Sequence, residues 1–200
     1  MEDNKPKNVR GTAKRSAVCL LGSPRIGNSH YLAGNLLNQL QNRSWHVHRH
    51  TLTDMTFTGC RNLFHCKSGS TTCGLSDDFS PVLEDIRQCD TLILASPVYF
   101  TDVTSDLKAA IERMFSFFVP DYPTAESKSR LAAGKSLVFI LTQGEGEHTY
   151  TDLMPRYWKS FSMLGFKEMH QVHVADVREV DAAENKEKSL RRVEEVAALL

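Results

Sequence analysis

The sequence predicts one doubly wound α/β domain, and three observations support this fold class. Short apolar runs of strand length alternate along the chain with segments whose apolar residues follow helical spacing. Two hundred residues are enough for one well-buried domain and too few for two of ordinary size. Residues 1–15 are polar and basic, so we expect a disordered tail there and a single domain over residues 16–200.

Five segments read as strands. The first, residues 17–21, is continuously apolar, as expected of a central parallel strand that is buried on both faces. The second, residues 46–50, alternates histidines with other residues, and we expect it at an edge of the sheet. The four later strands are predicted, in chain order, at residues 46–50, 91–96, 136–141 and 167–174.

Helices are predicted between the strands, from apolar residues at helical spacing. Their expected ranges are residues 29–41, 81–88, 107–118, 153–164 and 184–200. Strands that alternate with helices form parallel βαβ units with right-handed crossovers. We therefore expect a flavodoxin-like, five-stranded parallel sheet of order 2-1-3-4-5 with helices on both faces. Ligands of such sheets bind outside the carboxyl ends of the strands, where the strand order reverses.

The first strand ends in a small-residue loop that leads into a helix. Backbone N–H groups and the positive end of the helix would point from this loop toward a ligand, which suits a phosphate. Ser23, Asn28 and Ser29 add polar donors, and Arg25 adds a charge that can grip phosphate oxygens. The loop is neither a Walker loop nor a G-x-G-x-x-G fingerprint. A plain strand-to-helix connection with an N-cap at Asn28 or Ser29 is the alternative.

Two further loops should meet this one at the same edge of the sheet. One holds Pro97, Val98, Tyr99 and Phe100, which suit contact with a flat heteroaromatic ring, and the other holds Gln143, Gly144 and Glu145, whose backbone can bond the ring's polar edge. A phosphate seat beside a site for a flat ring describes FMN. The simpler interpretation of the two aromatic residues is that they only plug the end of the sheet.

Three motifs in this order resemble the NAD(P)H-dependent FMN reductase and multimeric flavodoxin superfamily. They are GSPRIGNS at residues 22–29, SPVYF at 96–100 and LKAAIER at 107–113. The resemblance spans roughly residues 16–175. It implies a flavodoxin-like fold, bound FMN, NADPH or NADH as co-substrate, and a homodimer or homotetramer with the flavin near a subunit boundary.

The resemblance also implies roles for individual residues. The phosphate would be held by Ser23, Arg25, Asn28, Ser29 and the His30 amide, with Gly27 in the same loop, and the ring would be flanked by Pro97, Val98, Tyr99 and Phe100. The implied activity passes electrons from NAD(P)H through FMN to a small acceptor such as a quinone or a flavin. The alternatives are an electron carrier or iron-sulfur-type flavoprotein without direct NAD(P)H turnover, and a chain that has lost its cofactor.

A cysteine-containing segment resembles the cluster loop of the iron-sulfur flavoprotein branch. Cys60, Cys66 and Cys73 fall at three of the four cysteine positions, but Leu63 occupies the second. Because four thiolates are the usual complement, we expect no iron-sulfur cluster and no metal. A zinc site that includes His65 is the alternative, although the spacing does not match the usual close pairing.

Two other patterns suggest different chemistry. His46, His48 and His50 would share one strand face and could bind a metal, although such alternation is more typical of a half-exposed edge strand. Cys19-x5-Arg25 matches the signature of low-molecular-weight tyrosine phosphatases, with Asp121 as a candidate general acid. Because Cys19 falls inside an apolar strand, we expect it to be a small core residue instead.

Charge and cysteine content indicate a cytoplasmic protein. Lysine plus arginine and aspartate plus glutamate both number 24, so the charge balance suggests neither a nucleic-acid nor a membrane partner. Five cysteines in a chain whose start lacks a secretory signal do not suggest a disulfide framework.

Overall fold

The sheet has the predicted parallel core. The structure is a computed structural model that describes residues 14–184 and 187–200. Its five parallel strands are β1 (Ser16–Leu21), β2 (His46–Thr51), β3 (Thr91–Tyr99), β5 (Lys135–Thr142) and β6 (Phe166–Val174). They lie in the order β2-β1-β3-β5-β6, which is the predicted order 2-1-3-4-5 when the parallel strands alone are numbered. The flavodoxin-like fold class is confirmed.

A sixth strand corrects the prediction of a five-stranded sheet. β4 (Asp102–Val103) pairs antiparallel with the end of β3, where Tyr99 lies opposite Asp102. The two residues of the turn, Phe100 and Thr101, have φ of 47° and 73°, as a type I′ hairpin requires. Such turns usually contain Gly, Asn or Asp, so a Phe-Thr turn gave no sequence signal for a hairpin.

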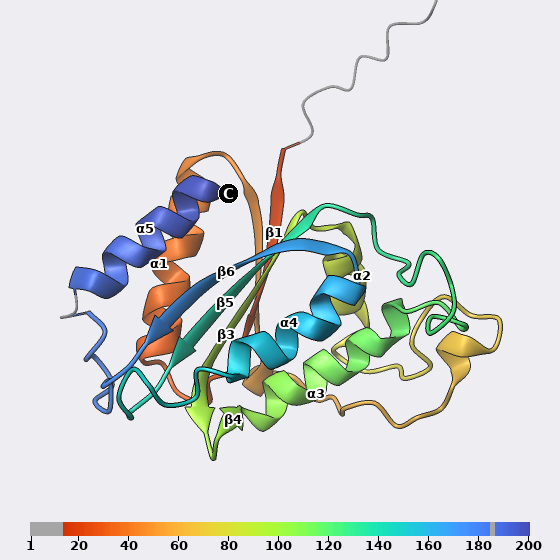
Figure 1. The fold of residues 1–200 in the computed structure, drawn as a ribbon, viewed down its shortest axis with the longest axis horizontal. Helices are drawn as coiled ribbons and strands as arrows, with labels where there is room; N and C mark the ends of the chain where they lie inside the picture. The colour runs from red at the N-terminus through yellow and green to blue at the C-terminus, as the bar shows by residue number, and fades with distance from the viewer. Residues whose placement is uncertain (1–13, 185–186) are drawn as a thin grey trace, which may run out of the picture.

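Helices cover both faces of the sheet. α1 (Asn28–Asn42) and α5 (Glu187–Leu199) lie on one face, and α2 (Ser80–Gln88), α3 (Ser105–Arg113) and α4 (Leu153–Met163) lie on the other (Figure 1). The predicted helix over 107–118 is α3 followed by a 3₁₀ turn, Met114–Phe117. No helix among the described residues is long and apolar enough to cross a membrane.

Burial on both faces explains the continuous apolar sequence of β1. Val18 and Leu20 belong to the core under α2, α3 and α4. Ala17, Cys19 and Leu21 belong to the core under α1 and α5. Successive side chains of a strand point to opposite faces, so a strand covered by helices on both sides needs an apolar residue at each position.

The expected tail of residues 1–15 lies outside the described residues except for Lys14 and Arg15. The Arg15 guanidinium lies 4.2 Å from the ring centroid of Trp45 and donates a hydrogen bond to the Leu200 carbonyl. Arg15 also accepts a backbone hydrogen bond from His46, at 2.8 Å. The chain is therefore in contact with the domain from Arg15 onward.

The long segment between β2 and α2 is held against α3 by a buried ion pair. Arg113 on α3 has a fully buried side chain and binds both carboxylate oxygens of Asp77, at 2.6 and 3.1 Å. The same guanidinium donates to the Thr58 carbonyl at 3.0 Å and to the Cys73 sulfur at 3.2 Å. Burial alone would raise the pKa of Asp77, but the hydrogen bonds and charge of Arg113 outweigh burial and lower that pKa.

We expect Asp77→Asn to lower the free energy of unfolding by about 3 kcal/mol, because the Arg113 guanidinium would stay buried without its counter-ion. Urea denaturation of the two proteins measures the difference. The control is Asp152→Asn, which breaks the solvent-exposed Arg156–Asp152 pair at 3.1 Å and should cost about 0.5 kcal/mol or less. Equal losses in the two variants would contradict the prediction.

Candidate functional site

The carboxyl ends of β1, β3 and β5 meet around one cleft, as the sheet order predicts. Two residues that follow β6 complete its wall. The lining residues are Ser23, Arg25, Gly27, Asn28, Ser29, Pro97, Val98, Tyr99, Thr142, Gln143, Gly144, Val177 and Arg178. All but three of the expected cofactor-binding residues therefore lie together on the walls of this cleft.

The three exceptions are His30, Phe100 and Glu145. The His30 side chain lines a neighbouring hollow on the other side of the 23–27 loop, and burial lowers its pKa. Phe100 is 101% exposed at the tip of the β3–β4 hairpin. The Glu145 carboxylate pairs with Arg178, at 3.1 Å, on the outside of the third loop.

The start of α1 provides the anion-binding feature of the cleft. The helix begins at Asn28, its N-cap residue Gly27 makes no side-chain hydrogen bond, and its first turn contains no acidic residue. The first N–H groups of an α-helix have no partner within the helix, so the positive end of α1 is free to bind an anion. Ser23 is buried and donates to the Arg25 carbonyl at 2.8 Å, which fixes the loop before the helix.

The Asn28 side chain ties the first loop to the chain that follows β6. Its Nδ2 donates to the carbonyls of Val177 and Glu179, at 3.3 and 2.7 Å, and its Oδ1 accepts from the Ala183 N–H at 2.8 Å. Because both ends of the amide are used in this way, the side chain positions the cleft wall. The donor that Asn28 offers to a ligand in this conformation is its backbone N–H.

Three lining residues were not predicted from the sequence. Thr142 exchanges a buried hydrogen bond of 2.8 Å with Ser29 and so joins β5 to α1. Val177 and Arg178 follow β6, the strand that ends at the same edge of the sheet. The signal that would have found the last two is topological, since the carboxyl ends of all the parallel strands lie at one edge.

The third loop is held in place by the Gln143 side chain. Its Nε2 donates to the carbonyls of Gly146 and Thr149, at 2.8 and 3.1 Å. Its Oε1 lies 2.6 Å from Nε2 of His173, which is the donor because an amide oxygen can only accept. Burial lowers the pKa of His173. The carboxamide therefore closes the loop, and the Gln143–Gly144 backbone remains at the cleft wall.

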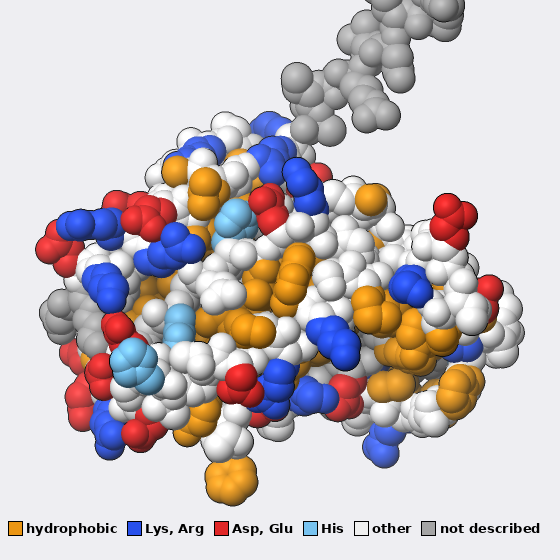
Figure 2. Space-filling view, in the orientation of Figure 1, with side chains coloured by type: hydrophobic (Ala, Val, Ile, Leu, Met, Phe, Trp, Pro, Cys, Tyr) orange, Lys and Arg blue, Asp and Glu red, His pale blue; other side chains and the backbone are white. Residues whose placement is uncertain are grey.

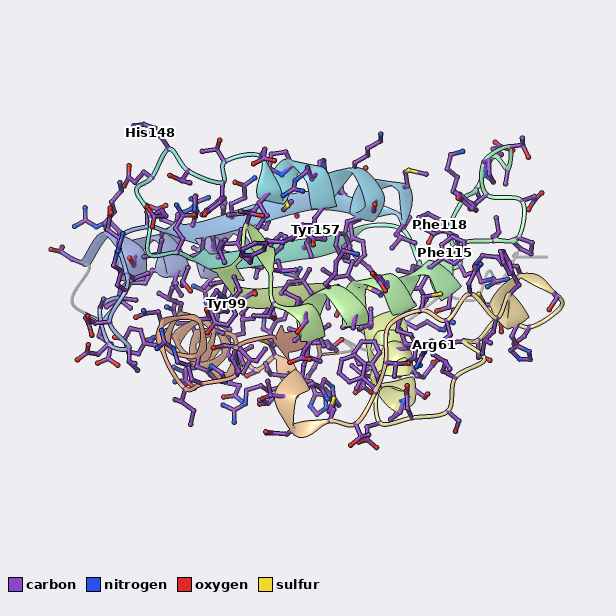
Figure 3. The ribbon with its side chains drawn as sticks, turned by 90° about the horizontal axis from the view of Figure 1, so that it is seen from below. Arg61, Tyr99, Phe115, Phe118, His148 and Tyr157 are labelled. Carbon is purple, nitrogen blue, oxygen red and sulfur yellow. The ribbon has the colours of Figure 1, made fainter. Side chains whose placement is uncertain are left out.

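The second loop is fixed by two polar contacts at the base of the hairpin. The Tyr157 hydroxyl on α4 donates to the Asp102 carboxylate at 2.7 Å, and burial together with this bond raises the pKa of Tyr157. The Ser96 hydroxyl accepts from the Thr104 N–H at 3.0 Å. These contacts hold Tyr99, which is 42% exposed, at the cleft (Figure 3).

The charged residues that line the cleft are both basic. Arg25 stands at its rim, and Arg178 donates through Nε to the Gly144 carbonyl at 3.0 Å. No acidic side chain among the described residues lines this cleft. Because Arg178 is already paired with Glu145, it is the charge of Arg25 that favours a ligand with negative charge at that end of the cleft.

The structure does not support the tyrosine phosphatase alternative. Cys19 is fully buried in the core between the sheet and α1, and burial raises the pKa of its thiol to about 12. A catalytic cysteine must instead be a thiolate at the mouth of its loop. Cys19 is a small core residue, as its place in the apolar strand suggested.

The sulfur atoms of the three cysteines in the 54–78 segment are not close together in the described structure. Among the described residues, Cys60, Cys66 and Cys73 are not part of any group of three potential metal ligands whose ligating atoms lie within 4.8 Å of one another. Cys60 is exposed, Cys66 is buried, and the Cys73 sulfur accepts a hydrogen bond from Arg113. The three cysteines line one small pocket with His65, but in this conformation their sulfur atoms are not gathered at ligand distance.

Comparisons with known proteins agree with the fold and the motifs. A model of the NADPH-dependent FMN reductase family matches residues 16–179. An iron-sulfur flavoprotein of Archaeoglobus fulgidus is 31% identical over 145 residues, a match that covers 71% of this chain and 63% of that protein. The matched region is thus less than two thirds of that relative's length.

Two solved structures share the fold. An FMN-dependent NADH-azoreductase from Bacillus anthracis, solved in complex with FMN, has a TM-score of 0.71 at 16% identity, over 92% of this chain and 98% of that one. An NAD(P)H:quinone oxidoreductase from Methanothermobacter marburgensis has a TM-score of 0.67 at 16% identity, over 92% and 96% of the two chains.

We expect Gly22→Ala to lower the free energy of unfolding by about 1–3 kcal/mol, because the added Cβ would lie 2.6 Å from Thr104 Oγ1 and 2.7 Å from Leu107 Cβ. Thermal and urea denaturation measure this loss. The control is Gly34→Ala within α1, where a Cβ meets nothing within 4 Å and should raise stability by roughly 0.5–1 kcal/mol. An unchanged free energy of unfolding in Gly22→Ala would show that the contact between residue 22 and α3 does not require a glycine.

Proposed function

Because this chain belongs to the NADPH-dependent FMN reductase family, we propose that it binds FMN in the cleft and passes electrons from NAD(P)H to a small acceptor such as a quinone or a flavin. The observation that carries the proposal is the convergence of three loops around a cleft that has an uncapped helix N-terminus on one wall. FMN combines a phosphate with a flat ring, which are the two groups that this cleft suits.

The phosphate would bind at the start of α1. The donors there are the Arg25 guanidinium and the first backbone N–H groups of the helix, including that of His30. The Ser23 hydroxyl would join them by exchanging its bond to the Arg25 carbonyl for one to the phosphate. Arg25 is exposed, so it would close over the phosphate from the rim, whereas Ser23 is buried beneath it. Charge-assisted bonds of this kind are stronger than neutral ones.

The ring would lie against the second and third loops. Pro97, Val98 and Tyr99 offer a rigid wall, and the Gln143–Gly144 backbone lies at another wall of the same cleft. Bound FMN would supply the redox chemistry, by accepting a hydride and passing on its electrons. The chain's own contribution is to orient the ring, to hold its phosphate and to leave one side open for a second substrate.

We do not extend the relatives' iron-sulfur cluster to this chain. Leu63 stands at the second cysteine position, and the three cysteines that are present are not gathered within ligand distance of one another. Four thiolates are the usual complement of a cluster. In the structure, Arg113 holds the 54–78 segment to α3.

An electron carrier that delivers to a protein is the second candidate function. Apolar side chains gather over the 54–78 and 119–134 segments, at the right of the molecule in Figure 2. Leu63 and Phe64 are 57% and 54% exposed there. A surface of this kind suits a protein partner more than a small acceptor.

The expected homodimer or homotetramer stays a prediction. Its support in the structure is apolar surface beside the cleft. Ile26, Phe100 and Val180 are 85%, 101% and 46% exposed. A second copy that covered these side chains would enclose the cleft, as the resemblance to multimeric flavodoxins implies.

We expect wild-type protein to bind FMN more tightly than riboflavin, and Arg25→Ala to weaken FMN binding about 10- to 100-fold through the loss of a charged hydrogen-bond donor. Riboflavin has no phosphate, so its affinity should be the same for both proteins. Titration followed by flavin fluorescence measures these affinities. The control is Arg61→Ala, whose side chain lies far from Tyr99 in Figure 3. Equal affinity of wild type for the two flavins would contradict the phosphate assignment.

We expect FMN-loaded protein to oxidise NADPH or NADH when a quinone or free FMN is present. The loss of nicotinamide absorbance measures turnover, and flavin-free protein assayed with the quinone is the control. If bound flavin is not reduced by either pyridine nucleotide, the chain is a carrier and the enzymatic proposal is wrong.

A further inference from the structure

The edge strand β2 presents a row of histidines toward α2. His46, His48 and His50 alternate along the strand, so their side chains share one face. The rings of His46 and His48 contact each other edge to face, with centroids 4.5 Å apart. β2 pairs only with β1 and is the outermost strand, so this row lies at the rim of the sheet.

α2 contributes a carboxylate to the same place. Oδ2 of Asp85 lies 3.0 Å from His50 Nε2 and 3.7 Å from His48 Nδ1. These three ligand atoms all lie within 4.8 Å of one another. Among the residues that the structure describes, they are the one group of three potential metal ligands brought this close.

The distances fit a single small metal ion. Zinc binds nitrogen and carboxylate oxygen at about 2.0–2.2 Å, so neighbouring ligands of a tetrahedral ion lie roughly 3.3–3.5 Å apart. The two distances to Asp85 Oδ2, 3.0 and 3.7 Å, lie on either side of this value. Small rotations of the two rings and the carboxylate would complete the geometry.

In the described part of the chain, the Asp85 carboxylate forms ion pairs only with histidines. These partners are His48 and His50, and no lysine or arginine among the described residues pairs with it. A divalent cation between the three side chains would balance this carboxylate and use the lone pairs of both rings. The side chains of His48, His50 and Asp85 are 40%, 18% and 33% exposed, so an ion can reach them from solvent.

We propose that His48, His50 and Asp85 bind a divalent transition-metal ion of the zinc type. Two imidazoles and one carboxylate favour such an ion over magnesium or calcium, which prefer oxygen ligands throughout. Three protein ligands leave at least one position of the ion open to water. The site is independent of the flavin cleft, since it lies on another edge of the sheet and shares no residue with it.

The bound ion would fasten the edge strand to its helix. The ligands come from β2 and α2, which are separated in sequence by the long 52–79 connection. An ion that binds the folded chain and not the unfolded one stabilises the fold by mass action. Zinc should therefore raise the melting temperature of the protein.

The test is calorimetric titration of full-length protein with Zn²⁺, with melting curves recorded on the same samples. We expect one high-affinity ion per chain in wild type, and at least a 10-fold loss of affinity in both Asp85→Asn and His50→Ala, together with loss of the zinc-dependent rise in melting temperature. The control is His148→Ala, an exposed histidine in the loop between β5 and α4, on neither of the elements that supply the ligands, which should bind zinc as wild type does (Figure 3).

X-ray absorption at the zinc edge separates this site from the thiols of the 54–78 segment. Zn–S bonds are about 2.3 Å long and Zn–N bonds about 2.0–2.1 Å, so the spectrum shows which atoms bind. We expect nitrogen and oxygen neighbours only. Sulfur neighbours, unchanged affinity in both site variants, or an equal loss in His148→Ala would overturn the proposal. Circular dichroism of the metal-free variants shows that they fold.

Discussion

The hydrogen bonding of β1 on both of its edges is the constraint from which the site follows. β1 pairs in parallel with β2 on one side and β3 on the other, and its residues Ala17 to Leu21 face Thr91 to Ala95 of β3 in register. The strand order of the sheet reverses at β1, because β2 lies on one side of it and the later strands lie on the other. The chain therefore leaves β1 toward one face of the sheet and leaves β3 toward the other. α1 and α3 therefore diverge, and the cleft lies where they separate.

The close approach of the first loop to α3 explains why residue 22 is a glycine, which the family resemblance alone did not explain. At Gly22 the chain passes so near the start of α3 that a Cβ would overlap Thr104 and Leu107. The glycine is therefore required by packing, whereas Gly27 has an extended backbone and a Cβ there would make only ordinary contacts. Two glycines five positions apart in one motif thus differ: packing requires the first, whereas the space around the second would admit a side chain.

The sequence was a sufficient guide to the sheet and an incomplete one to the side chains around it. A strand that is buried on both faces, such as β1, appears in the sequence as a continuous apolar run. The order of such runs along the chain predicts which loops meet. Loop side chains have no such period, so nothing distinguished Phe100, which points to solvent, from its neighbour Tyr99 at the cleft. Arg178 follows the edge strand β6 and carries no motif of its own, so only its place after a parallel strand indicates that it lines the cleft.

Internal hydrogen bonding decides which groups remain for a ligand. The carboxamides of Asn28 and Gln143 resemble free recognition groups in the sequence. In the structure, however, that of Asn28 joins the first loop to the chain after β6, and that of Gln143 closes the third loop. A wall fixed in this way loses little conformational entropy when a ligand binds. The groups left to make contact are mainly the backbone N–H donors at the start of α1 and the Arg25 guanidinium, a set that suits an anion. The polar side chains thus contribute to recognition by holding the backbone in place.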